Sequence, residues 1–356
     1  MNQRIKTIIL ISIAIVSAII VFLAAFLFFS RNSEEEIIKE PIAHDPDSTV
    51  FLSENGGMEW RGVEDIRFSV EKFMFTSDGR VLYTGTNGDG FWQSENGGRA
   101  FSLVEDKNTI VDAHSSIFDI ALPASRPPEA YVAVFTDDKG RIVTLQDEGF
   151  TEIYFSPLNR TAVSALALDP ADDSRLFFIS DVGFFESRDA GSTWRVVHRF
   201  TRPVEYLLAH PRRTGVFWAI TSRGELFHST DYGVTWENIN SRFRQFRGAN
   251  SIKNIFIDKT DRLYMISEEG LFTSVDAGVT WEEIPLIVPP DSLPITAFAV
   301  DPNDVRRIYV AAEAQLYTST DGGDSWQGRD FGGRRTIKAI AIDPRDSNRI
   351  LIGFDR

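Results

Sequence analysis

One eight-residue pattern, Ser-x-Asp-x-Gly-x-Thr-Trp, recurs along this chain and limits its possible folds more than any other feature. An Asp or Asn side chain can accept hydrogen bonds from backbone amides two residues on and so close a tight turn, while Gly supplies a backbone angle that other residues resist. The Trp then returns a large ring to an apolar layer. Each copy therefore predicts a hairpin turn between two strands. The five clearest copies are SENGGMEW (Ser53–Trp60), SRDAGSTW (Ser187–Trp194), STDYGVTW (Ser229–Trp236), SVDAGVTW (Ser274–Trp281) and STDGGDSW (Ser319–Trp326).

Two weaker copies, SENGGRAF at Ser94–Phe101 and LQDEGFTE at Leu145–Glu152, fill the gaps in the series. Aligned on the turn residue, the copies are separated by 41, 51, 42, 42, 45 and 45 residues. Seven units of this length, with about four strands each, are typical of β-propeller blades. The turn residues are Asn55, Asn96, Asp147, Asp189, Asp231, Asp276 and Asp321, and the returning rings are Trp60, Trp194, Trp236, Trp281 and Trp326.

The two ends of the chain carry complementary halves of one unit. The C-terminal stretch IKAIAIDPRDSNRILIGFD supplies the first two strands of a blade, and the N-terminal stretch TVFLSENGGMEWRGV supplies the last two. A blade shared in this way would close the ring without a free strand edge. We therefore predict an all-β fold, a seven-bladed propeller over residues 49–356 whose ends meet in one blade.

The N-terminal segment has a different character. Residues 8–29 form an uncharged apolar run of about the ~20 residues that cross a bilayer as a helix, without the short apolar core and small-residue cleavage site of a signal peptide. Arg4 and Lys6 precede this run, and the acids at 34–36 follow it. The positive-inside rule then predicts a cytoplasmic N-terminus (1–7), a single transmembrane anchor (8–29) in the cell membrane, a polar tether (30–48) and an extracytoplasmic propeller.

Composition excludes several classes of function. The chain has no cysteine, so it has neither disulfides nor thiolate sites, and its formal charge of −14 argues against a nucleic-acid partner. Its 5 histidines show no metal-ligand spacing, and no phosphate loop, nucleophile elbow or dinucleotide motif is present. We predict neither a metal nor a cofactor.

On the Ser, Asp, Gly and Trp positions of its repeats, the sequence resembles the Asp-box (bacterial neuraminidase repeat) propellers. That superfamily includes sialidases, two-propeller xyloglucanases, the sortilin ectodomain and photosystem II assembly factors of the Ycf48 type, and the single small ring here is most similar to the last group. The resemblance implies the fold and places the boxes at the periphery, away from any catalytic face, but it implies no particular reaction.

The resemblance to sialidases would imply an early Arg in a Phe-Arg-Ile-Pro motif and a Tyr nucleophile paired with Glu. The nearest stretch, FTRPVEY, lies in mid-chain, lacks that motif, and places Glu205 beside Tyr206 on one strand, where successive side chains point in opposite directions. A carboxylate-pair glycosidase stays open, because the 51 acidic residues could supply two acids across a substrate. We identify no catalytic residue.

Arginines concentrate in four of the links that would connect one blade to the next, at 156–162, 199–203, 240–250 and 328–336. Against them stands one acid, Asp330. Because all such links open on one face of a propeller, we predict an arginine-rich face that binds carboxylates or phosphates, with two phenylalanines between the arginines. The predicted binding residues are Arg160, Arg199, Arg202, Arg242, Phe243, Arg244, Phe246, Arg247, Arg329, Arg334 and Arg335.

The functional prediction is a non-enzymatic scaffold that binds acidic segments of membrane or exported proteins. The alternative is a glycoside hydrolase, or a glycan-binding lectin, that uses the same face. The oligomeric state stays open.

Overall fold

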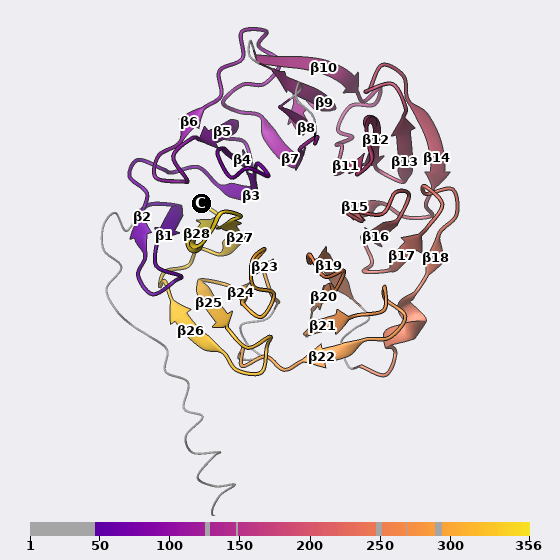
Figure 1. Cartoon of the computed structure of the whole chain (residues 1–356). Coiled ribbons are helices and arrows are strands. Elements are labelled where there is room, and N and C mark those ends of the chain that lie inside the picture. The colour runs from indigo at the N-terminus through magenta and orange to yellow at the C-terminus, as the bar shows by residue number, and fades with distance from the viewer. Residues whose placement is uncertain (1–46, 125–128, 147–148, 247–250, 269, 289–293) are drawn as a thin grey trace, which may run out of the picture. The chain divides into compact units, whose positions relative to one another are not determined.

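The computed structural model describes residues 47–124, 129–146, 149–246, 251–268, 270–288 and 294–356. Within them, strands β1 to β28 form seven four-stranded antiparallel sheets, which radiate from a common axis (Figure 1). The predicted seven-bladed propeller is confirmed. The predicted anchor (8–29) lies outside the described residues, and no helix within them is long and apolar enough to cross a membrane.

Six blades are continuous in sequence, each running from an innermost to an outermost strand. Blade 1 consists of β3 (Val70–Phe75), β4 (Leu82–Thr86), β5 (Phe91–Ser94) and β6 (Ser102–Leu103). Blade 2 consists of β7 (Ser116–Ala121), β8 (Ala130–Thr136), β9 (Lys139–Gln146) and β10 (Gly149–Phe155). Blade 3 consists of β11 (Ala165–Asp169), β12 (Asp172–Ser180), β13 (Gly183–Ser187) and β14 (Arg195–Arg199). Blade 4 consists of β15 (Val204–Ala209), β16 (Phe217–Thr221), β17 (Leu226–Ser229) and β18 (Glu237–Asn238). Blade 5 consists of β19 (Ile252–Ile257), β20 (Leu263–Ser267), β21 (Leu271–Ser274) and β22 (Glu282–Ile284). Blade 6 consists of β23 (Ala297–Val300), β24 (Ile308–Ala312), β25 (Gln315–Ser319) and β26 (Gln327–Asp330). A short 3-10 helix, η1 (Asn240–Phe243), follows β18.

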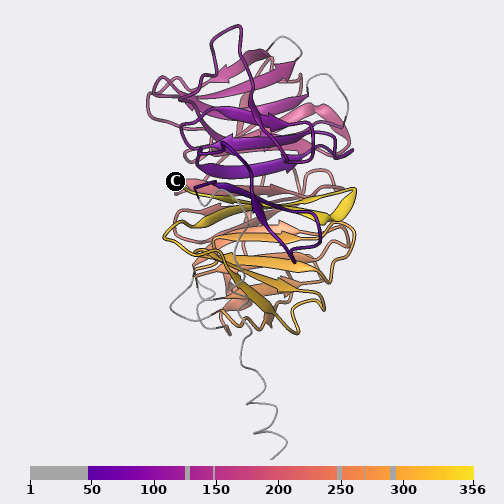
Figure 2. The same ribbon diagram turned by 90° about the vertical axis from the view of Figure 1, so that its left-hand side faces the viewer.

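The closing blade joins the two ends of the ring, as the sequence predicted. Its inner strands are β27 (Ile337–Asp343) and β28 (Asp346–Phe354), and its outer strands are β1 (Val50–Ser53) and β2 (Arg61–Gly62). β1 pairs with β28 over four residues, from Val50 opposite Gly353 to Ser53 opposite Ile350. Figure 2 shows the indigo N-terminal strands beside the yellow C-terminal ones. This pairing covers the edge of β28 that would otherwise be free.

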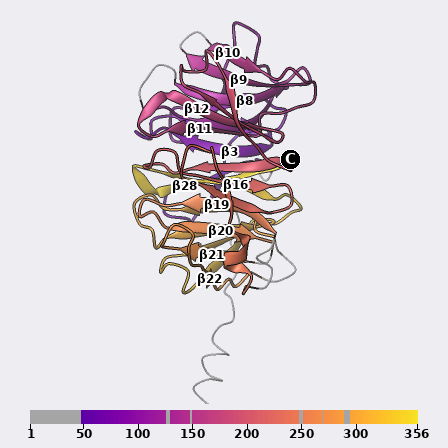
Figure 3. The ribbon, with the colours of Figure 1, turned by 90° about the vertical axis from the view of Figure 1, so that its right-hand side faces the viewer.

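The hydrophobic core lies between adjacent blades. One cluster packs Trp218, Ile220 and Leu226 of blade 4 against Leu263 and Met265 of blade 5, and every one of these side chains is buried. Figure 3 shows strands of these two blades in neighbouring layers. Each blade therefore depends on its neighbour to bury its apolar faces, as in other repeat folds.

The six described copies of the eight-residue box share one hydrogen-bond pattern. In each, the Ser Oγ accepts the Gly amide four residues on at 2.8–3.0 Å. The Asp or Asn Oδ1 accepts the amide four residues on at 2.8–3.0 Å. The prediction that the Asp or Asn accepts a backbone amide is confirmed, but the amide is four residues on. The amide two residues on, which belongs to the Gly, donates to the Ser hydroxyl instead. The remaining copy, at Asp147, lies outside the described residues.

The box tryptophans connect the turn to the body of the ring. The Nε1 of Trp60, Trp236 and Trp281 donates to the Gly carbonyl of its own box at 2.9–3.1 Å. Trp194 instead donates to the carbonyl of Ile153 in the preceding blade, and Trp326 donates both to the Gly323 carbonyl of its own box and to the carbonyl of Pro285 in the preceding blade. The boxes therefore stabilise their own blades and, at Trp194 and Trp326, the contact with the preceding blade.

The box carboxylates predict an acid-sensitive fold. Hydrogen bonds from the hydroxyl and amide of Ser325 lower the pKa of Asp321 to about 2, and those from Thr193 lower the pKa of Asp189. The unfolded value is about 3.9. A group whose pKa is lowered on folding contributes stability above its unfolded pKa and loses it as the pH falls through its folded pKa. We expect the thermal unfolding midpoint to drop between about pH 5 and about pH 2.

The variant Asp321→Asn tests the assignment, because Asn55 and Asn96 already serve as acceptors in two boxes. It should show a smaller drop in midpoint over this range than the original chain, measured by circular dichroism. Asp324→Asn, at an exposed position of the same turn, is the control and should retain the full drop. Equal pH profiles for Asp321→Asn and the original chain would contradict the assignment.

Candidate functional site

The connections between strands define two faces of the ring. Because neighbouring strands in each blade are antiparallel, successive connections alternate between the faces. The links between blades and the turns between second and third strands open on one face, which we call the loop face. The turns between first and second strands and the Asp boxes open on the other, the box face. The predicted binding site belongs to the loop face.

The loop face also carries acids that the links do not contain. The Oε2 of Glu225 lies 3.5 Å from the Nε of Arg202, and the Oε1 of Glu268 lies 2.9 Å from the Nζ of Lys253. The links alone carry the arginine excess, and the turns between second and third strands, which open on the same face, bring the acids. The face is therefore mixed in sign, and the predicted one-sided arginine excess is not supported. The acids of these turns and of the end of β28 are Asp89, Asp137, Asp138, Asp181, Glu225, Glu268, Glu313 and Asp355.

Four of the predicted arginines are exposed, and none of them forms an ion pair with the part of the chain that the structure describes. Arg202 is half-exposed beside Glu225, and Arg247 lies outside the described residues. These side chains are available to a partner, but they are distributed around the ring rather than gathered at one point. The exposed four are Arg160, Arg199, Arg244 and Arg334.

Three other predicted arginines have structural partners. Arg242 donates to Glu237 and to the carbonyl of Gly278, in the box of the next blade, both at 2.9 Å. Arg329 is 8% exposed and donates to the carbonyl of Met58 at 2.6 Å. Arg335 donates to the carbonyl of Ser48 at 2.7 Å. Arg242 joins blades 4 and 5, while Arg329 and Arg335 hold the N-terminal strands in place.

The two predicted phenylalanines belong to the core. Phe243 is fully buried in η1, where its ring meets Trp281 edge-on at 5.7 Å. Phe246 is half-buried, 5.1 Å from the ring of Phe272. The prediction that Phe243 contacts a partner is wrong: the chain folds back after β18, and blade 5 covers the ring.

An apolar row on the loop face of blade 2 was missed by the sequence analysis. Phe118, Phe155 and Leu158 are 47%, 51% and 66% exposed, values that are high for large apolar side chains. Phe118 meets the ring of Phe135 edge-on at 6.3 Å, and the ammonium of Lys139 lies 5.3 Å from the ring of Phe155. With strands ~4.8 Å apart, the row extends about 15 Å across the sheet.

A signal for this row exists in the sequence. In five of the seven innermost strands, a buried apolar residue at or near the start is followed by an exposed residue at a β-bulge, where the strand register shifts by one residue. This exposed residue is Glu71, Glu205, Lys253 or Lys338 in four blades, but Phe118 in blade 2. An apolar residue at a bulge position that holds a charged residue in the other four blades points to a contact with a binding partner.

The environment of Glu205 and Tyr206 does not favour sialidase chemistry. Glu205 occupies the bulge and is exposed, whereas burial raises the pKa of Tyr206, so its phenol keeps its proton at neutral pH. A tyrosine nucleophile needs an adjacent base to activate its hydroxyl. Among the described residues, no group of three or more His, Asp or Glu side chains could hold a metal ion.

Neither a protein-family model nor a curated protein sequence matches this chain. Solved structures do share its fold. A GH74 xyloglucanase from Xanthomonas campestris aligns with a TM-score of 0.66 and 18% identity, covering 81% of this chain and 51% of the enzyme. YCF48 from Cyanidioschyzon merolae aligns with a TM-score of 0.62 and 15% identity, covering 80% of this chain and 95% of that protein. YCF48 bound to D1 peptide gives a TM-score of 0.60 and 16% identity, covering 81% and 94%.

The chain therefore spans about half the length of the GH74 enzyme and nearly the whole length of the YCF48 structures. At these identities the likeness concerns the fold alone. The protein is a seven-bladed β-propeller whose fold is similar to that of YCF48 and of GH74 enzymes.

Proposed function

We propose that this propeller is a non-enzymatic docking platform that binds an exposed polypeptide segment on its loop face. The observation that carries the proposal is the apolar row of Phe118, Phe155 and Leu158, because large apolar side chains exposed together on one face of a blade are typical of an interaction site. Aromatic side chains are enriched in the centres of protein interfaces. The likeness in size to YCF48, one structure of which holds a peptide, supports the same reading.

The partner is a membrane or exported protein whose segment combines apolar and acidic residues. Its apolar side chains pack on the row, and its acids meet the cations nearby, Lys139 and Arg160. Exposed ion pairs contribute only about 0–1 kcal/mol each, so the apolar contact supplies most of the affinity and the cations set orientation. The N-terminal apolar segment (8–29) anchors the ring in the cell membrane and keeps it near such partners.

A glycoside hydrolase is the second candidate, favoured by the fold shared with the GH74 xyloglucanase. It requires two carboxylates on opposite sides of a bound sugar. The match covers only about half of that enzyme, so the shared fold brings no catalytic residue of the enzyme to this chain.

Site-specific photocrosslinking separates the two candidates. A benzophenone side chain placed at Leu158 in the full chain should give one discrete adduct in native membranes, and Phe118→Asp should reduce its yield at least several-fold. The same probe at Val279, which is 59% exposed on the box face, should not give that adduct. Absence of the adduct at Leu158 would refute the docking proposal. Hydrolysis of xyloglucan or another glycan by the purified chain, lost on changing one carboxylate, would establish the hydrolase instead.

A further inference from the structure

The same five residues, Ser-Glu-Asn-Gly-Gly, open two of the boxes, at 53–57 in the closing blade and at 94–98 in blade 1. The Asn in each is followed by a Gly with a left-handed backbone, with φ +75° at Gly56 and +72° at Gly97. An Asn before a Gly is prone to deamidation, because a residue without a Cβ lets its amide nitrogen approach the side-chain carbonyl carbon. The remaining Asn-Gly pair of the chain, at Asn87, lies outside the boxes. Because the two boxes share sequence and Gly conformation, any difference in their reactivity comes from their surroundings.

In the closing blade, hydrogen bonds hold both of the groups that would react. The amide of Gly56 donates to the carbonyl of Asn348 at 2.9 Å, and this bond must break before the nitrogen can attack. The Nδ2 of Asn55 donates to the Oε2 of Glu59 at 3.1 Å, so the group that would leave is held as well. The closing-blade box is therefore protected twice.

The box of blade 1 has neither of these hydrogen bonds. Among the described residues, neither the amide of Gly97 nor the Nδ2 of Asn96 has a hydrogen-bond partner. Residue 100 is Ala at the position that Glu59 holds in the closing blade, so no carboxylate is there to accept from Nδ2. The Oδ1 of Asn96 accepts the amide of Ala100 at 3.0 Å, which polarises the side-chain carbonyl, and the side chain is exposed to water.

The unpaired amide of Gly97 follows from a short turn between the first and second strands of blade 1. In blade 6 this turn closes with a hydrogen bond from the amide of Asp301 to the carbonyl of Arg307. The preceding carbonyl, that of Arg306, accepts the corresponding box amide at 2.8 Å. In blade 1 the closing bond runs from Thr76 to Val81, so the turn is one residue shorter and supplies no carbonyl to the box.

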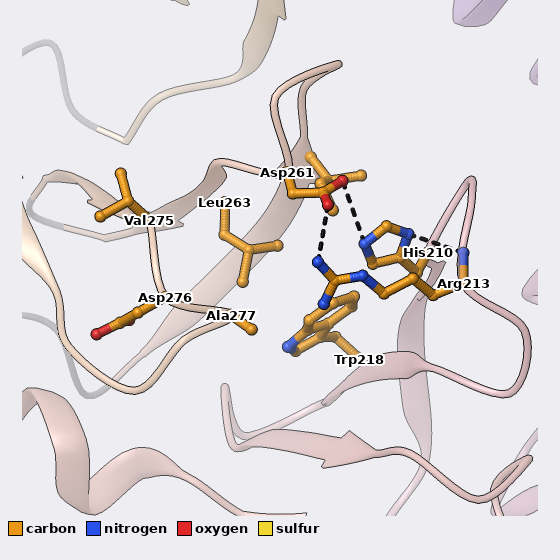
Figure 4. Close-up of a pocket in the computed structure, with 9 residues that line it drawn as sticks. His210, Arg213, Trp218, Asp261, Leu263, Val275, Asp276 and Ala277 are labelled. Carbon is orange, nitrogen blue, oxygen red and sulfur yellow. Dashed lines mark hydrogen bonds and ion pairs between the residues drawn. The ribbon is translucent and has the colours of Figure 1, made fainter.

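Blade 5 shows the same effect of a short turn. Its closing bond runs only from Asp258 to Arg262. Asp261 of this turn and Ala277, which holds the box position of Gly97, both line a small pocket (Figure 4). A gap thus lies between turn and box, and the amide of Ala277 has no hydrogen-bond partner among the described residues. This box cannot lose ammonia, because its turn residue is Asp276.

We propose that Asn96 is a site of spontaneous deamidation. The amide nitrogen of Gly97 attacks Cγ of Asn96 and gives up its proton, the Cγ–Nδ2 bond breaks, and ammonia leaves with that proton. The product is a five-membered succinimide, which water opens. Cleavage between the nitrogen and Cγ yields Asp, and cleavage between the nitrogen and the backbone carbonyl carbon yields isoaspartate. Water is the only other reactant, and ammonia is the only other product.

The two products affect the box differently. An Asp at position 96 has the acceptor oxygen that Asp189 and Asp321 use, so it can close the turn. Isoaspartate adds a methylene to the backbone and so disrupts the hydrogen bond from Gly98 to Ser94. The variant Asn96→Asp reproduces the first product and should keep the melting temperature of the original chain. A lower melting temperature would refute the inference that deamidation can leave the box intact.

Peptide mapping by mass spectrometry measures both sites in one sample of the full chain, incubated in mildly alkaline buffer. Asn96 should convert roughly tenfold faster than Asn55, because two hydrogen bonds must break before Asn55 can react. A synthetic peptide of residues 94–101 gives the rate without the fold. Equal rates at Asn55 and Asn96 would overturn the proposal, as would an unchanged Asn96 under conditions in which the peptide reacts.

Matched variants at the seventh box position separate the two restraints. Ala100→Glu supplies the missing acceptor for Nδ2 and should slow the conversion of Asn96 several-fold. Glu59→Ala removes that acceptor from the closing blade, but Asn55 should remain slower than Asn96, because the amide of Gly56 still donates to Asn348. An unchanged rate in Ala100→Glu would refute the role of Nδ2. Conversion of Asn55 in Glu59→Ala at the rate of Asn96 would refute the role of the turn.

Discussion

A chain that begins at Glu64, and so lacks β1 and β2, is expected to lose the cooperatively folded monomer. The deletion exposes the edge of β28 along the four-residue ladder that β1 now covers. It also removes Val50, Phe51, Leu52 and Trp60, each no more than 4% exposed. Full burial of such a side chain contributes about 1.5–3 kcal/mol, so the four together are worth roughly 6–12 kcal/mol. This is comparable to the ~5–15 kcal/mol net stability of a typical domain.

Size-exclusion chromatography and thermal melting would show this loss as aggregation or a broad, non-cooperative transition. A chain that begins at Asp47 is the matched control: it keeps every described strand and should melt as a monomer. Addition of a synthetic peptide of residues 47–63 to the shortened chain should restore part of the transition. A sharp transition of the shortened chain near that of the control would show that ring closure contributes little.

Gly233→Ala is expected to destabilise the fold by roughly 2–5 kcal/mol. Gly233 has φ +75°, and a Cβ there would lie 2.2 Å from Cε1 of Phe184, a fully buried ring of the preceding blade. The left-handed backbone accounts for about 1–2 kcal/mol of this cost, and overpacking against Phe184 for the rest. Urea unfolding of the two proteins measures the difference.

Gly322→Ala separates the two contributions. Gly322 has φ +86°, but a Cβ there would meet nothing within 4 Å. Ala190 and Ala277 fill the same place in their own boxes with φ of 53° and 58°. We expect a cost of about 1 kcal/mol or less for this variant. Equal losses of unfolding free energy in the two variants would mean that backbone strain in the turn, and not contact with Phe184, explains why position 233 is a glycine.

The blades and their closure could be predicted from sequence because they rest on local interactions. A box closes through hydrogen bonds between residues four apart, as between Ser187 and Gly191, so its letters are visible within eight positions. The shared blade could be predicted for the same reason: each terminus carries a recognisable half of a repeat whose missing half must be elsewhere.

Which residues are exposed on the loop face was decided only by the tertiary structure. Arg242 and Arg244 are two positions apart in one arginine-rich link, yet the first reaches the box of blade 5 and the second is exposed. Arg329 finds its partner at Met58, 271 positions away in the closing blade. A link sequence records which side chains it carries, but not which neighbouring blade covers them.

The sequence by itself therefore determined the number of blades, the turns that fasten them and the way in which the ring closes. The tertiary structure decided the mixed charge of the loop face and the exposure of Phe118. Each of these depends on residues from different turns or blades that come together in the folded ring. The burial of a side chain is set by those contacts. Local hydrogen bonds repeat with the sequence, whereas the surroundings of a side chain change from one blade junction to the next.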